Sequence, residues 1–184
     1  MQQFKIENYP WGGGYRPKTT ANLSWNQEEG FEIWMRCEEE EVRATYTKSD
    51  EPVYEDSCME CFMQFFPCDS KIYINFEVNA NGAMLAQMGE GKQGRMFLRD
   101  KGIEIPKVSV KREKGAWELR YRISLELLRA VYGRADFVKG QKIRGNFYKC
   151  GDRTKKPHYG CCFAIENETP NFHLPQFFGE IVIQ

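Results

Sequence analysis

Apolar and polar side chains alternate along much of the chain, and turn residues separate the alternating segments. In residues 71–79 every second position from Ile72 to Val78 is apolar, and the positions between them are polar. A period of two predicts a strand with one face turned to a core. Segments of this kind, or rich in aromatic and β-branched residues, are 22–26, 31–37, 42–46, 57–66, 71–79, 107–112, 116–123, 142–150 and 179–183.

One segment has the spacing of a helix instead. Residues 124–132 open with Ser124, a favoured N-cap, carry leucines at helical spacing, and end at Gly133. Many short strands with a single short helix predict an all-β fold, a sandwich or a barrel. With 184 residues and no linker-like stretch, we expect residues 1–184 to form a single domain.

The charge balance narrows the classes of partner. The chain has 26 Lys and Arg against 26 Asp and Glu, so its formal net charge is zero. Proteins that bind nucleic acid normally carry a basic excess that neutralises phosphates, so we expect no nucleic-acid partner. No apolar stretch approaches the length of a membrane span, so we expect no membrane partner either.

The seven cysteines indicate a reducing environment. Their number is odd, whereas disulfide frameworks use even sets, and the first residues contain no apolar run typical of a signal peptide. We therefore expect a cytoplasmic protein, or a secreted one if a leader has been removed. Cys58 and Cys61 lie three apart in a predicted strand, so their thiols point to opposite faces and are expected to be buried side chains.

The polar face of the predicted strands has an unusual composition. It carries Tyr73, Asn75 and Glu77 on one strand, Glu60 on another, and Arg144 with Asn146 on a third. Planar polar groups beside aromatic rings suit sugars, which offer vicinal hydroxyls to amides, carboxylates and guanidinium groups and C–H groups to a ring. The alternative is that these side chains satisfy one another or hold turns.

Four ordered blocks resemble the carbohydrate-binding module family 9-like proteins. The residues that carry the resemblance are Val53-Tyr54-Glu55-Asp56-Ser57-Cys58-Met59-Glu60, then Tyr73-Ile74-Asn75-Phe76-Glu77-Val78-Asn79 with Gly82, then Arg144-Gly145-Asn146-Phe147-Tyr148-Lys149-Cys150-Gly151-Asp152, and finally Phe172-His173-Leu174-Pro175 with Phe178-Gly179-Glu180-Ile181. Together they span roughly residues 40–184.

The resemblance implies a β-sandwich of two antiparallel sheets, of the jelly-roll or immunoglobulin-like kind, that binds a sugar without chemistry. It implies that Tyr54 stacks on a sugar ring, that Glu60 accepts hydrogen bonds from hydroxyls, and that Phe172 or His173 supplies the second aromatic group. Tyr73, Asn75, Glu77, Arg144 and Asn146 would line the site. The family implies no cofactor beyond structural calcium, for which Asp56 and Asp152 are the candidate ligands.

Two departures and two rival functions stay open at this point. Tyr54 stands where the family more often has Trp, and Cys162 occupies another Trp position, so a degenerate member with another ligand is one alternative. A glycoside-acting enzyme would use Glu60 and Glu77 as its carboxylate pair. A haem-binding sandwich would use His173 with a methionine such as Met59 or Met63, although these methionines fall on the core-facing phase.

Cys58 and Cys150 also fall inside the blocks of the resemblance. As buried residues in a strand or at its end, they are expected to lie outside any metal or redox site.

Overall fold

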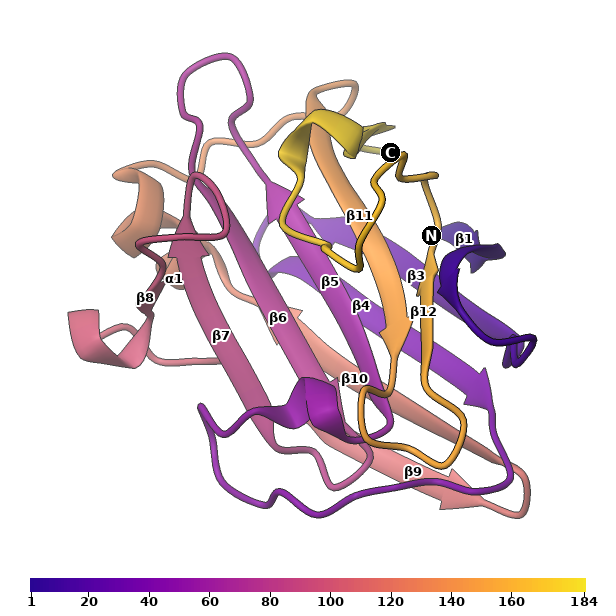
Figure 1. Ribbon diagram of the computed structural model, residues 1–184. Helices are drawn as coiled ribbons and strands as arrows, with labels where there is room; N and C mark the ends of the chain where they lie inside the picture. The colour runs from indigo at the N-terminus through magenta and orange to yellow at the C-terminus, as the bar shows by residue number, and fades with distance from the viewer.

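The computed structural model describes residues 1–184 and contains two antiparallel sheets that face each other (Figure 1). The five-stranded sheet has the order β1 (Gln2–Ile6), β3 (Thr19–Asn26), β4 (Gly30–Glu38), β10 (Ala116–Ile123) and β9 (Ser109–Glu113). The eight-stranded sheet has the order β2 (Asn8–Gly12), β12 (His158–Cys161), β11 (Lys142–Cys150), β5 (Cys58–Gln64), β6 (Tyr73–Asn79), β7 (Met84–Gly89) and β8 (Met96–Phe97), and β13 (Gly179–Val182) pairs with β11. The predicted β-sandwich is confirmed.

The core fills the space between the sheets, and the period of two explains which residues enter it. Met59, Cys61 and Met63 of β5 point inward beside alternate residues of β6, and all belong to one cluster of 31 buried residues. Trp117 of β10 reaches the same core from the other sheet. The alternating apolar positions of the sequence therefore form the inner face of the sandwich.

Strand β11 joins three parts of the chain. One of its edges pairs with β5 from Arg144 to Cys150. The other edge is shared, because β12 pairs with Tyr148–Cys150 and β13 pairs with Lys142–Gly145. The C-terminal part of the chain is thus held against the middle of the eight-stranded sheet.

The short helix α1 (Leu125–Tyr132) also matches its prediction. The Ser124 side chain accepts a hydrogen bond from the Leu127 backbone N–H and caps the first turn. Gly133 ends the helix with a φ of 73°, a left-handed conformation that glycine adopts without steric cost. The remaining helical turns are the 3₁₀ segments η1 (Val53–Glu55), η2 (Arg99–Lys101) and η3 (Pro175–Phe177).

The predicted strand at 42–46 is wrong, since this segment is a loop. Most of its backbone hydrogen bonds go to side chains, and the N–H groups of Thr45 and Tyr46 donate to the Asp56 carboxylate at 2.7 and 3.0 Å. The other predicted strands are present within three residues at each end. The pattern missed β1, β2, β7, β8 and β12 because they are short or, like β7, poor in β-branched residues.

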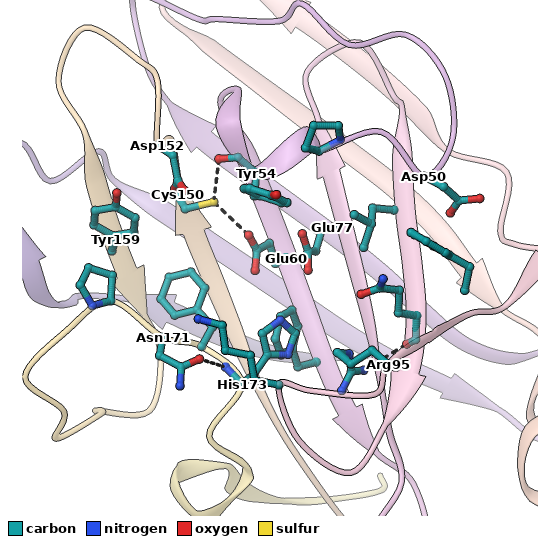
Figure 2. A pocket seen from close by; sticks show the side chains of 18 of the residues that line it. Asp50, Tyr54, Glu60, Glu77, Arg95, Cys150, Asp152, Tyr159, Asn171 and His173 are labelled. Carbon is teal, nitrogen blue, oxygen red and sulfur yellow. Dashed lines mark hydrogen bonds between the residues drawn. The ribbon is translucent and has the colours of Figure 1, made fainter.

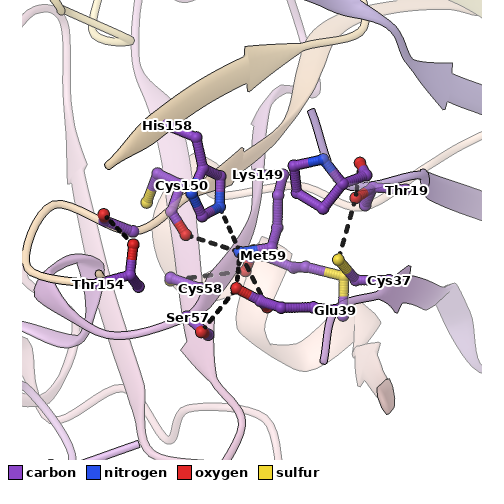
Figure 3. A network of polar contacts seen from close by, with 12 residues as sticks. Thr19, Cys37, Glu39, Ser57, Cys58, Met59, Lys149, Cys150, Thr154 and His158 are labelled. Atoms are coloured by element: carbon purple, nitrogen blue, oxygen red, sulfur yellow. Dashed lines mark hydrogen bonds and ion pairs between the residues drawn. The ribbon is translucent and has the colours of Figure 1, made fainter. Parts of the chain in front are cut away.

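A buried ion pair interrupts the apolar inner face of the eight-stranded sheet (Figure 3). Lys149 is fully buried, and its Nζ lies 3.3 Å from a carboxylate oxygen of Glu39, which is 3% exposed. The same ammonium group lies 2.8 Å from His158 Nε2. Ser57 Oγ and Trp117 Nε1 also donate to the Glu39 carboxylate. This network thus places a charged pair with its polar partners beside core side chains such as Trp117.

The outer face of the eight-stranded sheet is covered rather than solvated. The chain between β12 and β13 crosses in front of β11 and β5 (Figure 1). From this segment Ile165, Phe172 and Phe178 pack into a second apolar cluster with Phe62 and Tyr148. Every residue of β5 and β6 is buried, because the core covers the inner face of these strands and other segments of the chain lie over their outer face. No helix of the structure has the length and apolar character needed to cross a bilayer.

Candidate functional site

A pocket of about 700 Å³ opens on the outer face of the eight-stranded sheet (Figure 2). Its floor comes from β5, β6 and β7, and its walls come from the loop that carries η1, from the loop before β8, from the end of β11 and from the C-terminal segment. The residues that line it include Tyr54, Glu60, Phe62, Glu77, Gln87, Arg95, Cys150, Asp152, Tyr159, Asn171, Phe172 and His173.

Tyr54 stands at the rim of this pocket. It lies in η1, directly after the buried Val53 and before the ion-paired Glu55, and its side chain is 39% exposed. Its carbonyl oxygen accepts the Asp152 N–H at 3.2 Å, which ties η1 to the end of β11. The ring is thus carried on an anchored turn and remains free for contact with a ligand.

Two carboxyl groups lie side by side on the floor. Glu60 of β5 and Glu77 of β6 are direct partners in the strand register and are 2% and 4% exposed. Burial raises the pKa of Glu60 well above its usual range, and the neighbouring Glu77 charge adds to this. Burial also raises the pKa of Glu77 to about 7, with the Asn75 amide opposing the change. At neutral pH the pair therefore carries less than two charges, and a protonated Glu60 can donate as well as accept a hydrogen bond.

Arg95 brings a cation to the far side of the two carboxyl groups. In Figure 2 it lies with His173 on one side of Glu60 and Glu77, and Tyr54 and Asp152 lie on the other. Its guanidinium carbon is 4.2 Å from the centre of the Tyr73 ring, and its Nε donates to Asn75 Oδ1 at 3.0 Å. Burial lowers its pKa, an effect that the negative groups around it oppose.

Tyr73 and Asn75 form a layer behind Arg95 rather than part of the cavity wall. Both are fully buried and neither lines the pocket. Asn75 connects the two kinds of charge, because its oxygen accepts from Arg95 and its amide nitrogen donates to Glu77 at 2.8 Å. The two residues expected to line the site thus lie behind this pocket, because the loop before β8 places the Arg95 side chain between them and the cavity.

The C-terminal segment supplies the wall opposite Tyr54. The Phe172 ring stacks on Tyr148 at 4.1 Å with an interplanar angle of 11°. His173 Nδ1 is hydrogen-bonded to the Tyr73 hydroxyl at 2.9 Å, and its ring lies 4.8 Å from that of Phe62. Burial, with the nearby Arg95 charge, lowers the pKa of His173 to about 3, so its imidazole is neutral at physiological pH.

The chain also matches a known protein family. The sequence matches the model of carbohydrate-binding family 9 over residues 1–183. The chain belongs to carbohydrate-binding family 9. Among curated proteins no sequence relative is found.

Solved structures share the family 9 fold. A candidate carbohydrate-binding protein from Bacteroides uniformis ATCC 8492 superposes with a TM-score of 0.83 at 26% identity, over 100% of this chain and 86% of that one. A family 9 module from Caldicellulosiruptor kristjanssonii in complex with cellotriose gives a TM-score of 0.70 at 12% identity, over 100% of this chain and 82% of the module. A family 9 module from the same organism in complex with glucose gives a TM-score of 0.65 at 13% identity, over 97% of this chain and 84% of the module.

Two residues expected in the family 9 site lie elsewhere. Arg144 donates to the carbonyl oxygen of Phe178 at 2.9 Å and holds the C-terminal segment on β11. Asn146 is fully buried, donates to the carbonyl oxygen of Phe163 and accepts the N–H of the same residue. Neither lines the pocket. Both side chains bond to backbone groups of the segment that crosses the sheet. This matches the alternative interpretation of the polar face, in which polar side chains satisfy neighbouring groups of the protein.

The calcium candidates of the family 9 resemblance are a poor fit to the geometry. The Asp56 carboxylate accepts two backbone N–H groups and the Asn79 amide, and it pairs with Arg43 at 3.2 Å. Oxygens occupied by donors and by a cation are not available to Ca²⁺. Asp152 lines the pocket, where burial raises its pKa to about 6, but it belongs to no cluster of three ligand side chains.

The two methionines named for the haem alternative do not face His173. Met59 and Met63 belong to the core between the sheets. His173 lies on the outer side of the eight-stranded sheet, with Nδ1 bonded to Tyr73. The sheet therefore separates the histidine from both of these methionines.

Sequence reasoning missed several residues that line the pocket, chiefly Arg95, Gln87, Tyr159 and Asn171. Arg95 follows a glycine-rich stretch that reads only as a turn, and the sequence gives no signal that this turn folds back onto β6. Gln87 had a weak signal, because it is polar in an otherwise apolar stretch that forms β7. Their contribution depends on contacts between distant parts of the chain.

Proposed function

We propose that the pocket binds one or a few sugar units, with Tyr54 stacking on a ring and Glu60, Glu77 and Arg95 bonding to its hydroxyls. The observation that carries this proposal is an exposed aromatic ring at the rim of a pocket whose floor holds buried carboxyl groups beside a guanidinium group. The family assignment supports the same class of ligand.

The chemistry of the lining suits a neutral polyol. A pyranose has C–H groups that pack on the face of an aromatic ring and vicinal hydroxyls that bond to both oxygens of a carboxylate. The cavity of about 700 Å³ has the size of an ordinary small-molecule site. The relatives crystallised with cellotriose and with glucose make β-glucans the first ligands to test.

A binding role is favoured over catalysis by the placement of the carboxyl pair. Glycosidases hold their two carboxyl groups on either side of the scissile bond, about 5–9.5 Å apart. Glu60 and Glu77 occupy directly paired positions on one face of adjacent strands, so both meet the same side of a bound sugar. The Asn75 amide also donates to Glu77, which holds the Glu77 side chain in the pocket floor. We propose that the protein is not an enzyme.

The test is titration calorimetry with glucose, cellobiose and cellotriose. We expect binding by the wild type and a loss of at least about tenfold in affinity for Tyr54→Ala and Glu60→Gln. Trp34→Ala is the matched control, because Trp34 is a partly exposed aromatic residue on β4 of the other sheet. Absence of binding to any sugar of a glycan array, or equal affinity in all variants, would refute the proposal.

A turnover assay tests the enzyme alternative separately. Release of the aryl group from aryl glucosides by the wild type, abolished in Glu60→Gln, would establish the glycosidase instead.

As a further part of the proposal, the seven free cysteines favour a reducing compartment such as the cytoplasm.

A further inference from the structure

Three potential metal ligands converge at the edge of the pocket floor. The ligand atoms of Cys58, Glu60 and Cys150 all lie within 4.8 Å of one another, and the three residues are at most 2% exposed. They are the only group of three or more His, Cys, Asp and Glu side chains in the chain that lie so close together. Cys58 and Cys150 were expected to lie outside any metal site, and the strand register explains why they meet.

The sandwich topology makes this arrangement. Cys58 and Cys150 are direct partners in the antiparallel pairing of β5 with β11, although 92 positions separate them in the sequence. Glu60 follows Cys58 by two residues and therefore points to the same face of the sheet. Two thiols and one carboxyl group, held on paired strands, need little rearrangement to approach a common ion.

The Glu60 carboxyl group has little protein to bond with. Its hydrogen-bond partner is the Cys150 thiol, at 2.9 Å from Oε1 (Figure 2). The residue opposite it in the register is Glu77, a second buried carboxyl group. Two carboxyl groups in directly opposed strand positions disfavour each other's negative charge, and a cation bound to Glu60 would offset this effect. The carboxyl pair is an observation independent of the thiols, and it points to a cation.

We propose that Cys58, Glu60 and Cys150 bind a thiophilic divalent metal ion, with zinc as the best match. Zinc prefers four-coordinate sites of sulfur, nitrogen and carboxylate oxygen, whereas calcium and magnesium prefer oxygen alone. Glu60 and Cys150 line the pocket, so water or a ligand can reach the remaining position of the ion. Three protein ligands with one open position are the pattern of a reactive zinc site rather than a closed structural one.

Binding must displace protons. Each thiol loses its proton to become a thiolate ligand, and Glu60 also loses a proton where its carboxyl group carries one. The balance is one zinc ion taken up and about two to three protons released to the buffer per chain. This release distinguishes coordination by the thiols from loose attraction of an ion to surface carboxylates.

The experiment is a zinc titration of the full chain, kept reduced and first treated with a chelator, against a chromophoric competitor. We expect one zinc ion per chain, release of about two to three protons, and, with cobalt(II) in place of zinc, the charge-transfer absorption of cobalt–thiolate bonds. Cys58→Ala, Cys150→Ala and Glu60→Gln should each weaken binding at least about tenfold.

Two variants control for general effects on thiols and folding. Cys61→Ala removes a buried thiol from the same strand but on the core side, and Cys68→Ala removes an exposed one. Both should retain wild-type zinc affinity, and zinc should raise the melting temperature of both but not that of Cys58→Ala.

No uptake of zinc at micromolar concentration, or wild-type zinc affinity in the Cys58→Ala and Cys150→Ala variants, would overturn the proposal. The titration contains no sugar, so its result is independent of whether the pocket binds carbohydrate.

Discussion

Replacement of Lys149 by methionine tests the buried network in depth. The Lys149 side chain is fully buried, and its ammonium group lies 3.3 Å from Glu39 and 2.8 Å from His158 Nε2. Lys149→Met keeps the apolar stem and removes the charge, so Glu39 becomes a buried carboxylate without a cation. Removal of one partner from a buried ion pair costs about 3–5 kcal/mol. The bonds to Glu39 from Ser57 and Trp117 remain, which places the expected loss of unfolding free energy near the lower end, about 3 kcal/mol at pH 8.

The loss of unfolding free energy in Lys149→Met should depend on pH because of His158. Burial, followed by repulsion from Lys149, lowers the pKa of His158 to about 4 from its usual 6.5. A group with a depressed folded pKa binds its proton first in the unfolded state, so wild-type stability falls as pH drops from 6.5 toward 4. At pH 5.5 this loss is about 1.4 kcal/mol relative to pH 8. In Lys149→Met the repulsion is gone and Glu39 attracts the proton, so His158 should protonate in the folded state.

We therefore expect the difference between wild type and Lys149→Met to shrink by up to about 1.4 kcal/mol from pH 8 to pH 5.5. Urea denaturation at the two pH values measures it, and NMR titration of the His158 ring should show its pKa rise. The matched control is Lys155→Met, which breaks the exposed pair with Glu41 and should cause no measurable change at either pH. A loss below about 1 kcal/mol at pH 8, or an equal loss at both pH values, would refute the reasoning.

Three further predictions concern the covering segment, the pocket wall and the thiols. Asn146→Leu should lower the unfolding free energy by about 2–4 kcal/mol in urea denaturation, because the backbone groups of Phe163 lose their partner; an unchanged midpoint would contradict this. The pKa of His173 is lowered to about 3, so the wild type should lose stability as pH falls from 6.5 toward 3, and His173→Gln should lose less between pH 7 and pH 4 in thermal melts; parallel losses would contradict it. In the folded protein only the exposed Cys68 should react rapidly with a thiol reagent, and all seven thiols should react in denaturant; a lower count would reveal a disulfide.

The fold class and most of the strands can be predicted from the sequence. Alternation from Ile72 to Val78 identified the core-facing side of β6, and the Ser124 cap with Gly133 set the ends of α1. These features are local, because the backbone geometry of a strand or helix terminus acts within a few residues. The strand predicted at 42–46 is absent because backbone N–H groups of this segment donate to Asp56, a side chain outside the segment.

Which polar residues share the pocket depends on tertiary contacts. The sequence placed Glu60, Glu77, Arg144 and Asn146 on one polar face, but the C-terminal segment covers the latter two and leaves the carboxyl pair open. Tertiary contacts also place Arg95, from the turn between β7 and β8, in the lining of the pocket.

The clearest case is the meeting of Cys58 with Cys150. Each reads from the sequence as an isolated buried thiol, and only the register of β5 against β11 makes them neighbours. Strand pairing between distant segments depends on the packing of the whole sandwich, and no local pattern along the chain encodes it.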